Sequence, residues 1–168
     1  MIFYFFIVLI ALFLFILQVL FSLYIFYSNI FVEFLIISLI YFSLRYGSVF
    51  GEFYGFFCGL LLDTFSISIF GLRSLLFTIF GFLLGRLSKK IDETNIKVQV
   101  LLCLFILTFY YFFMFATSKI FYPINSAHIR FLAFLEKIVV NCFFAPLIFK
   151  LLDILTCRIE KWSGKANY

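Results

Sequence analysis

The chain has 168 residues, of which 66% are hydrophobic and 12% are charged, and its formal net charge is +5. Soluble domains are about 45–50% apolar and about 25% charged, so this composition excludes a water-soluble fold. A membrane span needs about 20 mainly apolar residues, and six such spans would use nearly the whole chain. The sequence therefore predicts a single all-α, polytopic membrane domain, with no room for a soluble catalytic domain.

Six apolar stretches follow one another along the chain, separated by short polar breaks. We expect spans at about 2–21, 31–44, 47–63, 71–87, 98–116 and 131–149, and then a cytoplasmic or interfacial tail at 150–168. The first stretch lacks a basic leader and a small-residue cleavage site, so we expect it to be retained as a helix. A last helix that reached Glu160 would be longer than a bilayer core, so it tilts, bends near Pro146, or lays its final turns on the membrane surface. Lys150, Asp153 and Arg158 favour the surface arrangement.

Basic residues are unevenly distributed between the two sides of this six-span arrangement. The side of both termini holds nine of them: Arg45, Arg86, Lys89, Lys90, Lys97, Lys150, Arg158, Lys161 and Lys165. The opposite side holds three: Arg73, Lys119 and Arg130. Because basic loops stay in the cytoplasm, we expect both termini to be cytoplasmic. The net charge of +5 then follows from topology and contact with anionic lipid, and it requires no nucleic acid.

Glycine recurs at every fourth position of the third predicted span, which reads GSVFGEFYGFFCGLLLD from 47 to 63. The stripe consists of Gly47, Gly51, Gly55 and Gly59, and Asp63 continues its register. A step of four residues advances about 40° around a helix, so the glycines form a slowly winding groove. In lipid, a surface without side chains lets a second backbone approach closely. The stripe therefore predicts a membrane helix that packs tightly against another helix.

The fourth predicted span has a small-residue row of its own. Its members are Gly71, Ser74, Thr78, Gly81 and Gly85, at steps of 3, 4, 3 and 4. This spacing is typical of the seam between two crossing helices. A short loop joins the third and fourth spans, so we expect their small faces to meet in a tight antiparallel hairpin. The alternative is that one of the two rows is reserved for the helix of a partner protein.

Two groups of polar residues are candidates for a structural or functional role. Asp63 and Arg73 flank the loop of the predicted hairpin, where we expect helix capping and an ion pair across the loop. Glu136, Lys137 and Asn141 form a polar cluster within or beside the last span. Because charges in lipid usually face the protein interior or a cavity, this cluster is a possible intramembrane site. The alternative is that the span begins just after Lys137, which leaves both charges at the outer interface.

Sequence motifs for catalysis are missing from the chain. It contains no Gly-rich phosphate loop, no H-E-x-x-H or G-x-S-x-G motif and no paired intramembrane aspartates. Its one histidine, His128, falls in a predicted outer loop, and its four cysteines lie in apolar stretches without C-x-x-C spacing. We therefore expect neither an enzyme nor a bound cofactor or metal.

Three elements follow one another between residues 59 and 86: spaced glycines ending in GLLLD at 59–63, FGL at 70–72 and GFLLGR at 81–86. In this order they resemble the MreD family of rod shape-determining membrane proteins. The stretch EFLIISLIY at 33–41 is similar to the second span of that family, although Val32 replaces the usual proline. The resemblance implies a six-helix protein of the bacterial cytoplasmic membrane, with a fold similar to the substrate-capture subunits of energy-coupling-factor transporters. It also implies a non-enzymatic partner of MreC that acts with MreB, RodA and a transpeptidase in lateral peptidoglycan synthesis.

Two other functions are compatible with these patterns. A transporter substrate-capture subunit for a vitamin or metal would have the same general form. Such subunits typically carry a small-residue motif on the first helix, whereas this helix is rich in Phe and Leu and has Ala11 alone. The third possibility is a packing subunit of another membrane complex.

Overall fold

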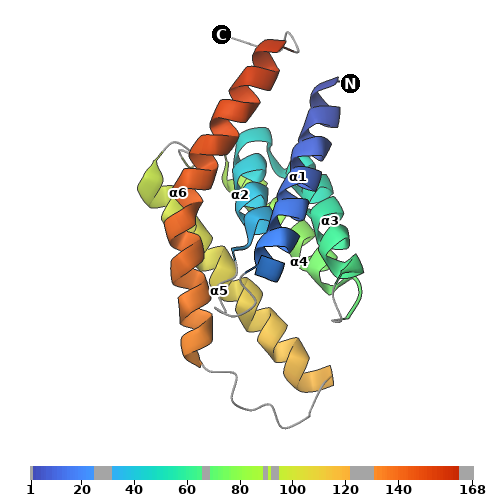
Figure 1. Ribbon diagram of the computed structural model, residues 1–168, viewed down its shortest axis with the longest axis vertical. Coiled ribbons are helices and arrows are strands. Elements are labelled where there is room, and N and C mark those ends of the chain that lie inside the picture. Colours follow the sequence, from blue (N-terminus) through green and yellow to red (C-terminus); the bar gives the residue numbers. More distant parts are fainter. Residues whose placement is uncertain are drawn as a thin grey trace.

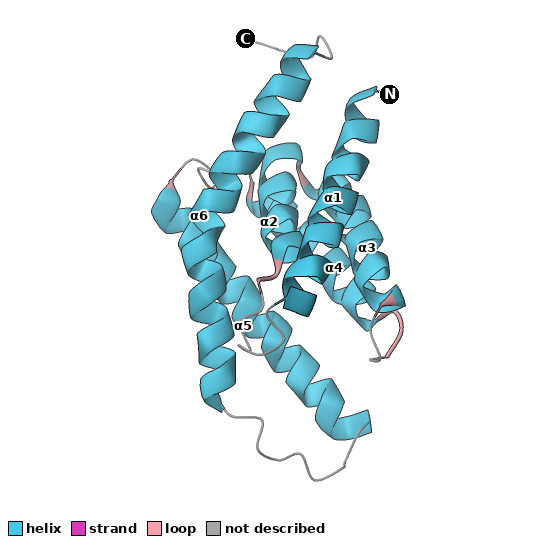
Figure 2. Ribbon diagram, in the orientation of Figure 1, coloured by secondary structure: helices cyan, strands magenta, loops and turns pink. Residues whose placement is uncertain are grey.

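The computed structural model describes residues 2–24, 32–65, 69–88, 91, 95–121 and 131–162. Six helices make up this part of the chain: α1 (Ile2–Tyr24), α2 (Phe34–Tyr46), α3 (Ser48–Thr64), α4 (Leu72–Leu87), α5 (Ile96–Phe121) and α6 (Phe131–Trp162). Figure 2 shows helices and connecting loops, with no strand among the described residues. The prediction of an all-α protein is therefore confirmed. Lys89, Lys90, Arg130, His128 and the tail beyond residue 162 lie outside the described residues.

Helix α2 lies at the centre of the molecule and contacts each of the other five helices (Figure 1). All ten residues from Leu35 to Leu44 are buried. A helix that is apolar on every side is stable only when it is surrounded, and the sequence LIISLIYFSL has this character. The two serines of this stretch are buried with the rest. The Ser38 hydroxyl donates to the Leu35 carbonyl at 2.9 Å. It also forms a hydrogen bond of 2.9 Å with the Tyr54 hydroxyl, in which either group can donate.

Three of the described helices are long and apolar enough to cross a membrane. The candidate spans are Phe5–Leu23 in α1, Ile96–Thr117 in α5 and Glu136–Lys161 in α6. Helices α2, α3 and α4 have 13, 17 and 16 residues. At 1.5 Å per residue they measure about 20–26 Å, somewhat less than a hydrocarbon core of about 30 Å. The structure is thus that of a membrane protein, and the crossing of all six helices stays a prediction.

The last helix differs from its predicted bounds. We expected a span ending at 149 and a separate interfacial tail, but α6 runs without interruption from Phe131 through Pro146 to Trp162. Figure 1 shows α6 changing direction along its length, as helices commonly do at a proline. It ends at the same end of the molecule at which α1 begins.

Contacts with α2 explain why α6 extends this far. Arg45, at the end of α2, forms ion pairs with Asp153 and Glu160 of α6. Tyr41 of α2 shares a hydrogen bond of 2.7 Å with Thr156, and Tyr46 donates one of 2.8 Å to Glu160. Of the polar residues that suggested a surface-lying tail, Asp153 binds the end of α2. Whether the final turns of α6 lie on the membrane surface stays a prediction.

Candidate functional site

Helices α3 and α4 are packed so closely that the backbone of each touches the other at glycine positions. Four pairs make this contact: Gly51 with Gly81, Gly55 with Phe77, Gly59 with Ser74, and Ser48 with Gly85. A Cβ atom added at any of the five glycines would come within 3.0 Å of a backbone atom of the facing helix, a separation that real side chains essentially never have. The small face of each helix is therefore filled by the other helix.

Two of the predicted row members have open space where a side chain would lie, although the backbone of Gly47 itself lies against Gly85. A Cβ atom at Gly47 or Gly71 would meet nothing within 4 Å. Gly47 instead separates α2 from α3 with a φ of 87°, and Gly71 precedes α4 with a φ of 91°. Positive φ values favour glycine, because other residues are strained there. Glycine at these two positions is therefore explained by backbone conformation beside the helix starts, and not by a side chain that would clash with the facing helix.

The hydroxyl residues of the α4 row have unequal roles. Ser74 is buried, and its Oγ donates to the carbonyl of Phe56 across the helix pair, at 3.3 Å. Thr78 is half-buried, and its Oγ1 donates at 2.7 Å to the carbonyl of Ser74 in its own helix. Of these two hydroxyl side chains, only that of Ser74 donates a hydrogen bond to the other helix.

Asp63 caps the start of α4 from the end of α3. Its carboxylate accepts hydrogen bonds from the backbone N–H groups of Gly71 at 3.0 Å, Ser74 at 3.1 Å and Arg73 at 3.4 Å. These groups would otherwise lack partners at a helix N-terminus. Asp63 is 2% exposed, so the surrounding protein shields its carboxylate. We expected an ion pair between Asp63 and Arg73, but the ion pairs found among the described residues do not include it. The Arg73 guanidinium instead donates to the Leu62 carbonyl, 3.5 Å away.

The polar cluster predicted in α6 is divided by the structure. Glu136 is exposed and points away from the interior, whereas Lys137 is half-buried and Asn141 is fully buried. The Asn141 side chain donates to the Lys137 carbonyl at 2.8 Å and accepts from the backbone N–H of Glu33 at 2.7 Å. Asn141 therefore fixes the chain just before α2 against α6.

Residues from other elements complete this polar region, and no local sequence pattern predicted their part in it. Gln18 of α1 donates to the Glu33 carboxylate at 2.8 Å and accepts from the Leu35 N–H at 3.1 Å. Gln18 is the only amide or charged residue of α1, and an isolated amide in a lipid-facing helix usually turns inward. That feature could have identified Gln18, but its partner Glu33 could not be inferred from local spacing.

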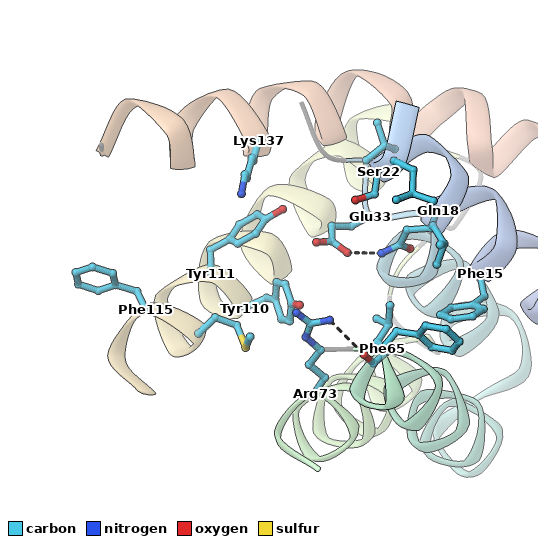
Figure 3. A pocket seen from close by; sticks show the side chains of 15 residues that line it. Phe15, Gln18, Ser22, Glu33, Phe65, Arg73, Tyr110, Tyr111, Phe115 and Lys137 are labelled. Carbon is cyan, nitrogen blue, oxygen red and sulfur yellow. Dashed lines mark hydrogen bonds between the residues drawn. The ribbon is translucent and has the colours of Figure 1, made fainter. Parts of the chain in front are cut away.

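A pocket of about 640 Å³ lies beside these residues. Every helix or its flank contributes to its wall, and the contributors include Gln18, Glu33, Leu62, Arg73, Tyr110 and Lys137. Figure 3 shows the charged ends of Glu33, Arg73 and Lys137 turned toward this space. The volume falls in the range of small-molecule sites, about 300–1,000 Å³. Among the described residues no group of three His, Cys, Asp or Glu side chains could hold a metal ion.

Comparison with protein families decides the identity of this helical arrangement. The family model described as rod shape-determining protein MreD matches residues 1–155. The chain belongs to the MreD family. The resemblance inferred from the glycine motifs is thereby confirmed. No curated protein and no solved structure matches the chain.

The motifs that suggested the MreD family occupy two places in the structure. The elements at 59–63, 70–72 and 81–86 all belong to the α3–α4 hairpin or its loop. The element at 33–41 begins with Glu33 at the pocket and continues along the central helix α2. The residues that resemble other MreD proteins therefore build the hairpin and part of the pocket wall.

Proposed function

We propose that this MreD-family chain is a non-enzymatic membrane scaffold of the bacterial cell-elongation machinery. In this role it binds an MreC-like single-span protein and supports lateral peptidoglycan synthesis and rod shape, in contact with MreB, RodA and a transpeptidase directly or through MreC. It lies in the cytoplasmic membrane, with six spans and both termini in the cytoplasm. A fold like that of the energy-coupling-factor capture subunits is part of the same proposal.

The observation that carries this proposal is the family match over residues 1–155. Packing limits where a partner helix can bind, since the small faces of α3 and α4 are occupied by each other. A partner helix would then bind another surface. Large apolar side chains are exposed on the outward sides of several helices, for example Phe53, Phe112 and Phe143. Such surfaces suit lipid and a single-span partner alike.

Co-purification tests the proposal. In mild detergent the chain should retain an MreC-like single-span protein expressed with it, and removal of the chain from a rod-shaped cell should make the cell round. A control single-span protein of equal hydrophobic length should not be retained. The proposal would be contradicted if the chain did not retain the MreC-like protein and if cells without the chain kept their rod shape.

The second candidate is a substrate-capture subunit of an energy-coupling-factor transporter. The pocket of about 640 Å³ with its converging polar groups favours this function. The two candidates differ in what the cell loses without the chain. Vitamin uptake that depends on the chain, together with unchanged cell shape, would replace the scaffold with the transporter function.

A further inference from the structure

The pocket lies at the end of the molecule opposite to the chain termini. It is lined by the late part of α1, the starts of α2, α4 and α6, the end of α3 and the second half of α5. In the proposed orientation this is the outer side of the membrane. Its walls are mostly apolar, with Phe15, Leu62 and Met114 among the lining residues. A pocket of this composition holds an apolar body and a small number of polar groups.

The polar part of the pocket contains two cations and one carboxylate. One oxygen of the Glu33 carboxylate accepts a hydrogen bond from Gln18 at 2.8 Å, and the charge of Glu33 offsets part of the charge of Arg73 and Lys137. Arg73 and Lys137 lie on opposite sides of the space in Figure 3. The lining residues therefore carry one more positive than negative charge. In surroundings of low dielectric constant, such an excess favours an anion.

Arg73 provides the more specific observation. Its Nε atom is buried and has no hydrogen-bond partner in the part of the chain that the structure describes. Its Nη1 reaches only the Leu62 carbonyl, at 3.5 Å. Asp63, the nearest carboxylate in sequence, uses both oxygens on the backbone of α4. A guanidinium binds phosphate and carboxylate groups through two parallel N–H donors, and buried donors left without an acceptor are costly.

The rim of the pocket carries exposed apolar side chains. Leu23 and Phe65 both line it and are 69% and 71% exposed. An apolar chain or ring can therefore continue from the pocket past these residues. The combination of an oxyanion-binding interior and an apolar rim suits an amphipathic molecule.

We propose that this pocket binds an amphipathic ligand through its oxyanion, a phosphate or carboxylate held by Arg73 and Lys137, with the apolar part along Phe15 and the rim. A membrane lipid with an anionic headgroup and a water-soluble oxyanion share this chemistry. The inference is independent of partner binding, because it rests on the pocket alone.

Binding measurements on the full chain in neutral detergent test this inference. The probes are a short-chain phosphatidylglycerol, a diacylglycerol of the same chain length and inorganic phosphate. We expect phosphatidylglycerol to bind in preference to the diacylglycerol, and Arg73→Gln and Lys137→Gln each to weaken its binding about tenfold or more. Arg73→Lys keeps the charge but loses the paired donors, so it should weaken binding less than Arg73→Gln. Arg158→Gln, an exposed arginine on α6, is the matched control and should leave affinity unchanged.

The outcomes separate the sources of the ligand. Tight binding of phosphatidylglycerol with weak binding of phosphate identifies a lipid. Equal affinity for both identifies a free oxyanion and overturns the inference that the pocket also holds an apolar part. Lys137→Gln leaves the α3–α4 contact intact, so it remains informative if Arg73→Gln fails to fold. Equal binding of phosphatidylglycerol and diacylglycerol, or equal affinities in Lys137→Gln and Arg158→Gln, would overturn the inference. MreC-like partner capture should be measured on the same samples, because its failure would bear on the scaffold proposal and not on the pocket.

Discussion

At the scale of single residues, Asp63 shows how one side chain connects two helices. Its two oxygens accept three backbone N–H groups at the start of α4, while its own backbone belongs to the end of α3. A buried carboxylate is costly without such partners. Capping was expected from its position in the sequence, and the partners found here are backbone groups and not the Arg73 side chain.

Asp63→Asn tests this cap. Asparagine keeps one acceptor oxygen but turns an NH₂ group toward N–H donors, so we expect the protein to lose about 1–3 kcal/mol of stability. The measurement is thermal unfolding of the purified protein in detergent. Glu52→Gln removes a carboxylate from the same helix, away from the start of α4, and should change the midpoint much less. Equal midpoints for the wild type and Asp63→Asn would show that the cap does not stabilise the hairpin.

At the scale of elements, the α3–α4 pair is held together by backbone contact. The sequence predicted which faces would meet, because small residues at helical spacing mark one side of each helix. It also extended the rows to Gly47 and Gly71, where a Cβ atom would meet open space, although the backbone of Gly47 lies against Gly85. Spacing alone cannot show where a helix stops, and both residues lie at positive φ beside the helix ends.

Gly55→Leu tests the contact. A Cβ atom at this position would come within 3.0 Å of the Phe77 backbone in α4, and backbone cannot move aside as a side chain can. Overfilling a packed interior costs about 1–3 kcal/mol, whereas the gain in helix propensity is about 1 kcal/mol at most. We therefore expect a lower thermal midpoint in detergent. Phe53→Leu, at a position that is 70% exposed on the same helix, is the control and should have little effect. Unchanged stability of Gly55→Leu would mean that the glycine face is open to lipid.

At the scale of the whole molecule, long-range contacts limited what the sequence could predict. Six helices and the family followed from local apolar stretches and glycine motifs. The polar region around Glu33 did not, since Gln18 is 15 positions away and Asn141 is 108 positions away. The extension of α6 has the same origin, because its ion pairs with Arg45 join residues more than 100 positions apart. No local pattern connects such residues.

The number of membrane crossings matters most, since the proposed scaffold function and the outer position of the pocket both depend on it. Helices α1, α5 and α6 alone meet the length criterion among those described, so a three-span protein is the clear competing arrangement. In that arrangement, the chain between α1 and α5 would stay on one side of the membrane. With six spans, it would cross the membrane and bring Phe70 and Asn95 to opposite sides.

Cysteine accessibility in intact cells distinguishes the two arrangements most directly. The native cysteines are first replaced, and Phe70→Cys and Asn95→Cys are then introduced separately at these two exposed positions. An impermeant thiol reagent added outside should label the cysteine at position 70. It should label the cysteine at position 95 only after the membrane is permeabilised. Labelling of both positions in intact cells would contradict the six-span scaffold with cytoplasmic termini.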